Sequence, residues 1–110
     1  MNGPLLILTT TFDSTEKAEE VAAAMVDHGL AVCAQVDGPM RSFYRWQGQL
    51  QRDSEVRVTF KVLPDRFELF CGELRLQHPY DVPQMTAWPA AWVDPRYLDW
   101  ALGKDTGEGS

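Results

Sequence analysis

Two side chains of this sequence are ligand types that suit copper or zinc: the imidazole of His78 and the thiol of Cys33. His78 opens the stretch HPYDVPQM, residues 78–85, in which two prolines enclose Tyr80. Proline lacks a backbone donor and fixes φ, so this stretch can neither continue a helix nor lie inside a sheet. One imidazole and one thiol complete a metal site only if other side chains contribute. The stretch is therefore either a stiff connector with an orienting hydrogen bond to His78, or a turn that presents a ligand.

The amino-acid composition limits the classes of protein to which this chain can belong. A chain of 110 residues with 45% hydrophobic residues predicts one globular domain. Its net charge of −6 argues against nucleic acid and anionic membranes as partners. No apolar run approaches a membrane span, and the N-terminal residues lack the features of a signal peptide, so we expect a cytoplasmic protein. The two cysteines, Cys33 and Cys71, form no CxxC pair and predict neither a disulfide framework nor a structural zinc site.

Patterns typical of catalysis are missing from the sequence. It contains no glycine-rich phosphate loop, no GxSxG and no HExxH. Glu55 and Lys61 share one face of a predicted strand, but six residues of strand separate them by roughly 20 Å. They can meet only through other strands or other subunits. We therefore expect a protein that is not an enzyme.

The elements that must position these side chains follow from hydrophobic periodicity. Residues 5–10 form a short apolar run that predicts a buried strand. Asp13 and Glu16 have the spacing of a capping box before a helix that ends at Gly29. The apolar stripe of this helix consists of Ala18, Val21, Ala22, Met25 and Val26. Residues 30–37 alternate as a strand, and Gly38-Pro39 is expected to interrupt it.

The rest of the chain predicts a long hairpin, a helix, a strand and a final helix. Residues 41–62 have β-favouring composition with a turn at residues 47–49. Pro64 suits the start of a helix that ends at Gln77, because the residue before a proline is disfavoured in the α conformation. Residues 84–88 can form a short strand, and Asp94-Pro95 begins a last helix whose inward residues are Tyr97, Leu98, Ala101 and Leu102. The order predicts a ferredoxin-like βαββαβ sandwich of the α+β class, with a long hairpin and a C-terminal helix.

The long hairpin needs a partner. Its turn-side half carries Phe43, Tyr44 and Trp46, rings that a monomer would expose along a sheet edge. Pairing with another copy of the chain and closure into a ring would cover them. The alternative is that the hairpin folds back over its own subunit.

In these motifs the chain resembles the CutA family of divalent-cation tolerance proteins. The matching motifs are AVCAQV (31–36), SFYRWQGQLQRDSEV (42–56), Lys61, HPYDVPQM (78–85) and YLDW (97–100). The resemblance implies a single CutA-like domain over residues 1–103, and the polar tail, residues 104–110, is expected to be disordered. It also implies a homotrimer paired through the edge strands of the long hairpin. Carried over position by position, the polar residues of an intersubunit cleft would be Cys33, Trp46, Glu55, Lys61, His78 and Tyr80.

Two positions depart from the family pattern. Gln84 stands where the family usually has Glu after the second proline, and Gln35 stands where it usually has Asn. Gln84 therefore remains a candidate cleft residue that lacks the carboxylate. The resemblance implies a non-enzymatic trimer with copper or another divalent cation in its clefts, for which His78 and Cys33 are the candidate metal ligands. The alternative is a trimeric signalling or adaptor protein, related in shape to PII proteins, that binds a small ligand or a partner protein.

Overall fold

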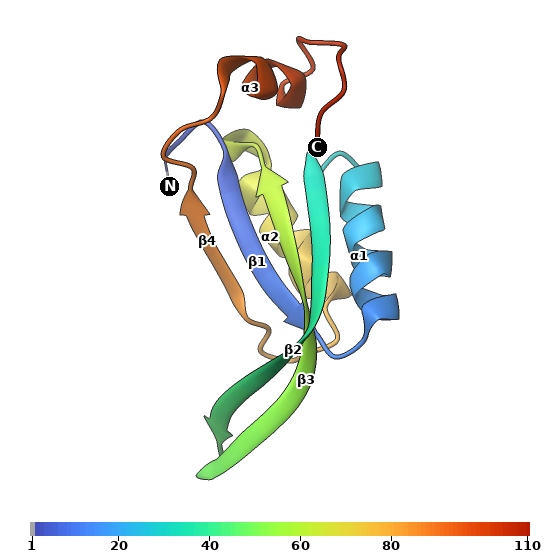
Figure 1. Ribbon diagram of the computed structural model, residues 1–110, viewed down its shortest axis with the longest axis vertical. Helices are drawn as coiled ribbons and strands as arrows, with labels where there is room; N and C mark the ends of the chain where they lie inside the picture. The colour runs from blue at the N-terminus through green and yellow to red at the C-terminus, as the bar shows by residue number, and fades with distance from the viewer. Residues whose placement is uncertain (1) are drawn as a thin grey trace.

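The structure is a computed structural model that describes residues 2–110, and it confirms the α+β class (Figure 1). Four strands form one antiparallel sheet in the order β2-β3-β1-β4. Helices α1 and α2 lie together behind this sheet, whose other face is left uncovered by them (Figure 1). The elements are β1 (Leu6–Phe12), α1 (Thr15–Asp27), β2 (Cys33–Trp46), β3 (Gln49–Val62), a 3-10 turn η1 (Pro64–Arg66), α2 (Phe67–Gln77), β4 (Met85–Pro89) and α3 (Pro95–Ala101).

The core lies between the sheet and α1 and α2. Alternate residues of β1 and β3 point to the helices, and the predicted inward set of β3 (Val56, Val58, Phe60 and Val62) is buried. Phe60 packs edge to face on Phe70 of α2 at a centroid distance of 4.9 Å. The apolar stripe of α1 is buried as predicted, except for Val26, which is 38% exposed. The hydrophobic periodicity therefore predicted which sheet face the helices cover.

The start of α1 corrects one prediction. The N-cap is Ser14, whose hydroxyl accepts a hydrogen bond from the Lys17 backbone N–H at 3.1 Å. Asp13 stands one residue before the cap and is exposed. Both residue types cap helices well, so spacing alone favoured the wrong neighbour. The carboxylate of Asp13 is consequently free of the capping role.

Strand β2 is one continuous strand with a bulge. The pairing with β3 shifts between Asp37 and Met40, so Gly38-Pro39 bends the strand and does not end it. Gly38 has φ +134°, and a Cβ there would lie 3.1 Å from the Glu55 carbonyl oxygen. Beyond the bulge, residues 40–55 extend from the body as a two-stranded arm (Figure 1).

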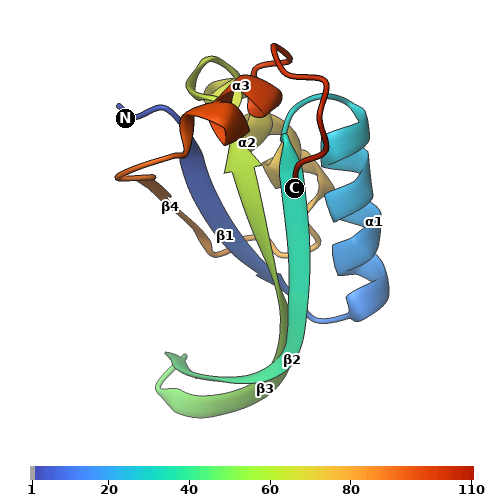
Figure 2. The same ribbon diagram turned by 45° about the horizontal axis from the view of Figure 1, so that its top comes forward.

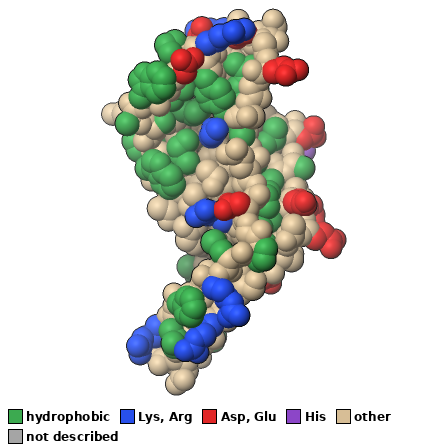
Figure 3. Space-filling view, in the orientation of Figure 1, with side chains coloured by type: hydrophobic (Ala, Val, Ile, Leu, Met, Phe, Trp, Pro, Cys, Tyr) green, Lys and Arg blue, Asp and Glu red, His purple; other side chains and the backbone are tan. Residues whose placement is uncertain are grey.

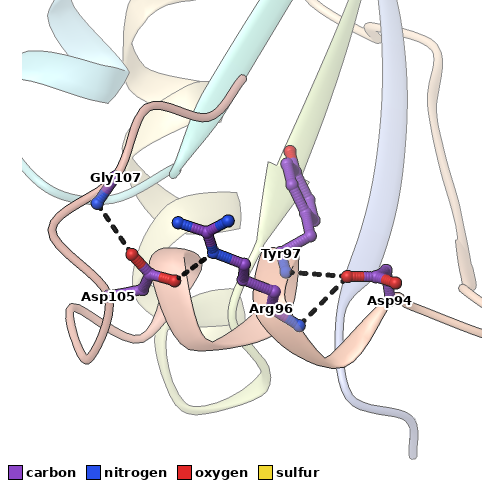
Figure 4. Close-up of polar contacts among 5 residues, drawn as sticks. All are labelled: Asp94, Arg96, Tyr97, Asp105 and Gly107. Carbon is purple, nitrogen blue, oxygen red and sulfur yellow. Dashed lines mark hydrogen bonds and ion pairs between the residues drawn. The ribbon is translucent and has the colours of Figure 1, made fainter.

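The C-terminal helix crosses the end of the sheet opposite the arm (Figures 1 and 2). Asp94 caps it as predicted, because its carboxylate accepts from the backbone N–H groups of Arg96 and Tyr97 (Figure 4). The prediction that Leu102 points inward is wrong, since it is 45% exposed just after the helix ends. Short helices present few inward positions, and no residue of α3 is buried.

Candidate functional site

His78 sits at the arm end of the sheet, where α2 stops. It is 7% exposed, and its ring stacks on Phe12 at a centroid distance of 4.4 Å. Its Nε2 lies 2.8 Å from the Thr11 carbonyl oxygen, which can only accept, so Nε2 carries the proton. Its Nδ1 accepts from the Tyr80 backbone N–H at 3.1 Å. Both ring nitrogens are therefore engaged, and burial lowers the pKa of His78 from 6.5.

Tyr80 continues this cluster toward the arm. Its ring packs edge to face on His78 at 4.9 Å, and its hydroxyl donates to the Glu55 carboxylate at 3.2 Å. Burial, followed by the nearby charge of Glu55, raises the pKa of the Tyr80 hydroxyl. The phenol consequently keeps its proton and holds Glu55. The two prolines thus fix a turn whose His78 and Tyr80 connect α2 and β1 to the base of the arm.

Cys33 and Lys61 lie at the other end of the sheet, directly opposite each other on β2 and β3. Cys33 is 8% exposed, and the Lys61 ammonium donates to the Tyr97 hydroxyl of α3 at 3.2 Å and lies 5.1 Å from the Tyr97 ring centre. Tyr97 projects from α3, which an ion pair between Arg96 and Asp105 at 2.8 Å ties to the following segment (Figure 4). Lys61 therefore anchors α3 to the sheet.

The remaining two candidates, Gln84 and Trp46, make none of these contacts. The Gln84 amide donates to the hydroxyls of Thr9 and Thr86, at 3.4 and 3.2 Å, on the uncovered face of the sheet. Trp46 ends β2 at the tip of the arm and is 60% exposed. Its partner Gln49 is six residues from Glu55 along β3, so Trp46 is roughly 20 Å from the base of its own arm.

Within one subunit the candidates therefore form two separate groups, Glu55 with His78 and Tyr80 at the arm end and Cys33 with Lys61 at the other end. Ile7, the neighbour of Lys61 on β1, is four residues from Thr11, so Cys33 lies more than roughly 13 Å from His78. Within residues 2–110, no group of three or more His, Cys, Asp and Glu side chains is close enough to hold a metal ion. The donor set of a single chain does not fit copper.

A hollow at the base of the arm was missed by sequence reasoning. It is lined by Asp13, Tyr44, Asp53, Ser54 and Tyr80. The Tyr44 hydroxyl donates to the Asp53 carboxylate, and this bond raises the pKa of Tyr44. Asp13 was assigned to the helix cap, and Asp53 lies far from residue 80 in the sequence. Only the register of β2 with β3 could have signalled the Tyr44–Asp53 neighbourhood.

Comparison with known proteins agrees with the fold and its order of motifs. Residues 6–104 match the family described as "CutA1 divalent ion tolerance protein". The chain is 35% identical over 101 residues to the divalent-cation tolerance protein CutA of Thermus thermophilus, covering 92% of this chain and 97% of that protein. It is 33% identical over 98 residues to the protein of the same name from Pyrococcus horikoshii, covering 89% and 95%.

Solved structures give the same result. CutA from Synechococcus elongatus superimposes with a TM-score of 0.87 at 32% identity, over 91% of this chain and 88% of that one. CutA1 from Shewanella sp. SIB1 superimposes with a TM-score of 0.89 at 25% identity, over 97% and 100%. In the described residues, 2–110, no helix is long and apolar enough to cross a membrane.

Proposed function

Because the chain belongs to the CutA1 divalent ion tolerance family, we propose that it acts in divalent-cation tolerance as a non-enzymatic homotrimer that binds a divalent cation, copper included, between subunits. The observation that carries the proposal is the separation of the candidate residues within one chain. Trp46 at the arm tip and Glu55 at the arm base meet only if the arm of one copy reaches the base of another. The proposed cleft therefore forms only when subunits assemble.

The arm supports assembly in two ways. The rings of Tyr44 and Trp46 are 45% and 60% exposed on one face of it. Its strand β2 is an edge of the sheet along its whole length, so one row of backbone N–H and C=O groups has no strand partner within the described residues. The other edge is β4. Pairing of unlike edges around a threefold axis closes a ring and leaves no edge free.

The uncovered sheet face supports it as well. Trp88 and Trp92 are 46% and 74% exposed, and Trp92 lines an apolar hollow with Ile7 and Tyr97. Three sheets facing a common axis would cover these rings. The tryptophans would then pack a subunit contact.

The cation must be bound by side chains from two chains, because residues 2–110 of one chain contain no group of three or more His, Cys, Asp and Glu side chains close enough to hold it. His78 joins such a set only if Nδ1 gives up the Tyr80 N–H. The oxygens of Asp13 and Asp53 beside Tyr80 provide the negative charge that a cation needs in the cleft.

Calorimetric titration of metal-free protein with Cu²⁺ and Zn²⁺ tests the cation. We expect a dissociation constant below about 100 μM, at most one ion per cleft, and loss of binding in His78→Gln. His28→Gln is the matched control, since His28 is the only other histidine and is exposed at the end of α1. Weaker binding, or equal binding in both variants, contradicts the cation proposal.

The second candidate function is binding of a small organic ligand or a partner protein by the same clefts. Two observations favour it: both nitrogens of His78 are engaged, and the Gln84 amide bonds to Thr9 and Thr86. A site built from amide, phenol and hydroxyl groups recognises polar organic groups better than metals. A trimer that binds no divalent cation in the calorimeter would support this candidate.

A further inference from the structure

The arm has two faces of different chemistry. Opposite partners in the register share a face, so Arg41, Phe43 and Arg45 of β2 lie on the same side as Ser54, Arg52 and Leu50 of β3. The other side carries Met40, Ser42, Tyr44 and Trp46 with Glu55, Asp53, Gln51 and Gln49. All three arginines of the arm are therefore on one face, here named the arginine face, and both of its carboxylates are on the other.

The three guanidinium groups on the arginine face have no anionic partner. Arg57 and Arg96 each pair with a carboxylate at 2.8 Å, whereas no ion pair or hydrogen bond is formed by the side chains of Arg41, Arg45 and Arg52 among residues 2–110. Figure 3 shows these cationic side chains around apolar ones on the arm, with no acidic side chain among them. Like charges gathered without a counter-charge repel each other, and a bound anion relieves this repulsion.

Apolar groups lie among the arginines. Phe43 is 62% exposed and Leu50 is 53% exposed. Phe43 stands midway between Arg41 and Arg45 on β2, directly across from Arg52. The arginines on β2 are four residues apart, roughly 13 Å, with the ring between them. On this face a guanidinium group, an aromatic ring and a second guanidinium group therefore follow one another at the spacing of every second residue of an extended chain.

We propose that the arginine face binds an extended acidic segment of a partner protein, with carboxylates four residues apart and an apolar residue midway between them. The carboxylates accept from Arg41 and Arg45, Arg52 adds a third cation, and the apolar residue packs on Phe43. A long nucleic acid fits less well, because the net charge of −6 on the chain repels a polyanion at a distance.

Phe43, whose ring was expected from the sequence to be covered by another copy, is assigned here to the partner segment, because pairing of strand edges does not require the arginine face. Strand pairing uses backbone groups in the plane of the sheet, whereas these side chains stand perpendicular to that plane. A trimer would thus display three such faces. The inference does not depend on cation binding, so a protein that binds no metal leaves it standing.

Fluorescence anisotropy with a labelled peptide tests the inference on the full chain. The probe is a ten-residue peptide with two glutamates four residues apart and phenylalanine midway, and its control has glutamine at both glutamate positions. We expect salt-dependent binding that is at least fivefold weaker for the control peptide. Arg41→Gln with Arg45→Gln should weaken binding about tenfold, since each exposed ion pair contributes about 0.2–1 kcal/mol.

The matched control variant is Arg66→Gln with Arg75→Gln, which removes the same charge from exposed positions around α2. It should bind the peptide as the unmodified protein does. Phe43→Ala should also weaken binding, with sedimentation confirming an unchanged assembly. No binding of the acidic peptide, equal loss in both double variants, or tighter binding of an oligonucleotide of equal charge would each overturn the proposal.

Discussion

Replacement of His78 by alanine tests the reading of HPYDVPQM as a turn held by its own histidine. The substitution removes the Nε2–H bond to Thr11 and the Nδ1 acceptor for Tyr80, at about 1 kcal/mol each. It also removes the stacked contact with Phe12, worth about 0.5–1.5 kcal/mol. Together these losses amount to about 3 kcal/mol of the free energy of unfolding.

Urea denaturation followed by tryptophan fluorescence measures this loss at one fixed chain concentration, because assembly contributes to stability. With a slope of about 1–3 kcal/mol per molar urea, the midpoint should fall by about 1–3 M. His28→Ala, at an exposed position, should change the free energy by less than about 0.5 kcal/mol. A loss below about 1 kcal/mol for His78→Ala would refute the assigned hydrogen bonds.

Three further predictions address other positions. Burial holds the pKa of His78 below 6.5, so near this pH the unfolded chain binds more protons than the folded chain. The free energy of unfolding should therefore be highest above pH 6.5 and should fall as the pH drops from 6.5 toward the lowered pKa. Urea titrations at pH 7.5 and 5.5 measure this fall, which should be smaller in His78→Gln. Thr10 is fully buried, and its hydroxyl has no hydrogen-bond partner among residues 2–110, so Thr10→Val should raise the free energy of unfolding by about 1 kcal/mol; a decrease in thermal scans would contradict this. Lys61→Met should loosen α3, because it removes the contacts with Tyr97. The backbone amides of α3 should then exchange hydrogen about fivefold faster, as measured by mass spectrometry. Unchanged exchange rates would show that Lys61 does not anchor the helix.

Periodicity predicted the elements that face the core. Val58 and Phe60 alternate with polar residues on β3, and a half-buried strand is the arrangement that satisfies this pattern. The end of α2 was also predictable, because the sterics of Pro79 act on the residues immediately before it. Secondary structure can be predicted from neighbouring residues where a single local interaction determines it.

Predictions failed where two local solutions have nearly equal energy. Ser14 and Asp13 are both good helix caps, and Gly38-Pro39 can end a strand or bulge it. The resemblance to the CutA family supplied the residues of the candidate site, but it did not supply how they group within one chain. The approach of Tyr44 to Asp53 depends on the register of β2 with β3, and the approach of Tyr80 to Glu55 depends on how the turn docks against the base of the arm. That docking is a tertiary contact which no short window of sequence contains.

Native mass spectrometry of the full chain with Cu²⁺ or Zn²⁺ shows whether the cation site lies between subunits, because it counts chains and ions together. We expect a species of three times the chain mass of 12.4 kDa that carries bound metal, with no metal on dissociated single chains. A monomeric protein, or metal held equally well by single chains, would contradict the claim that the cation site is formed between subunits.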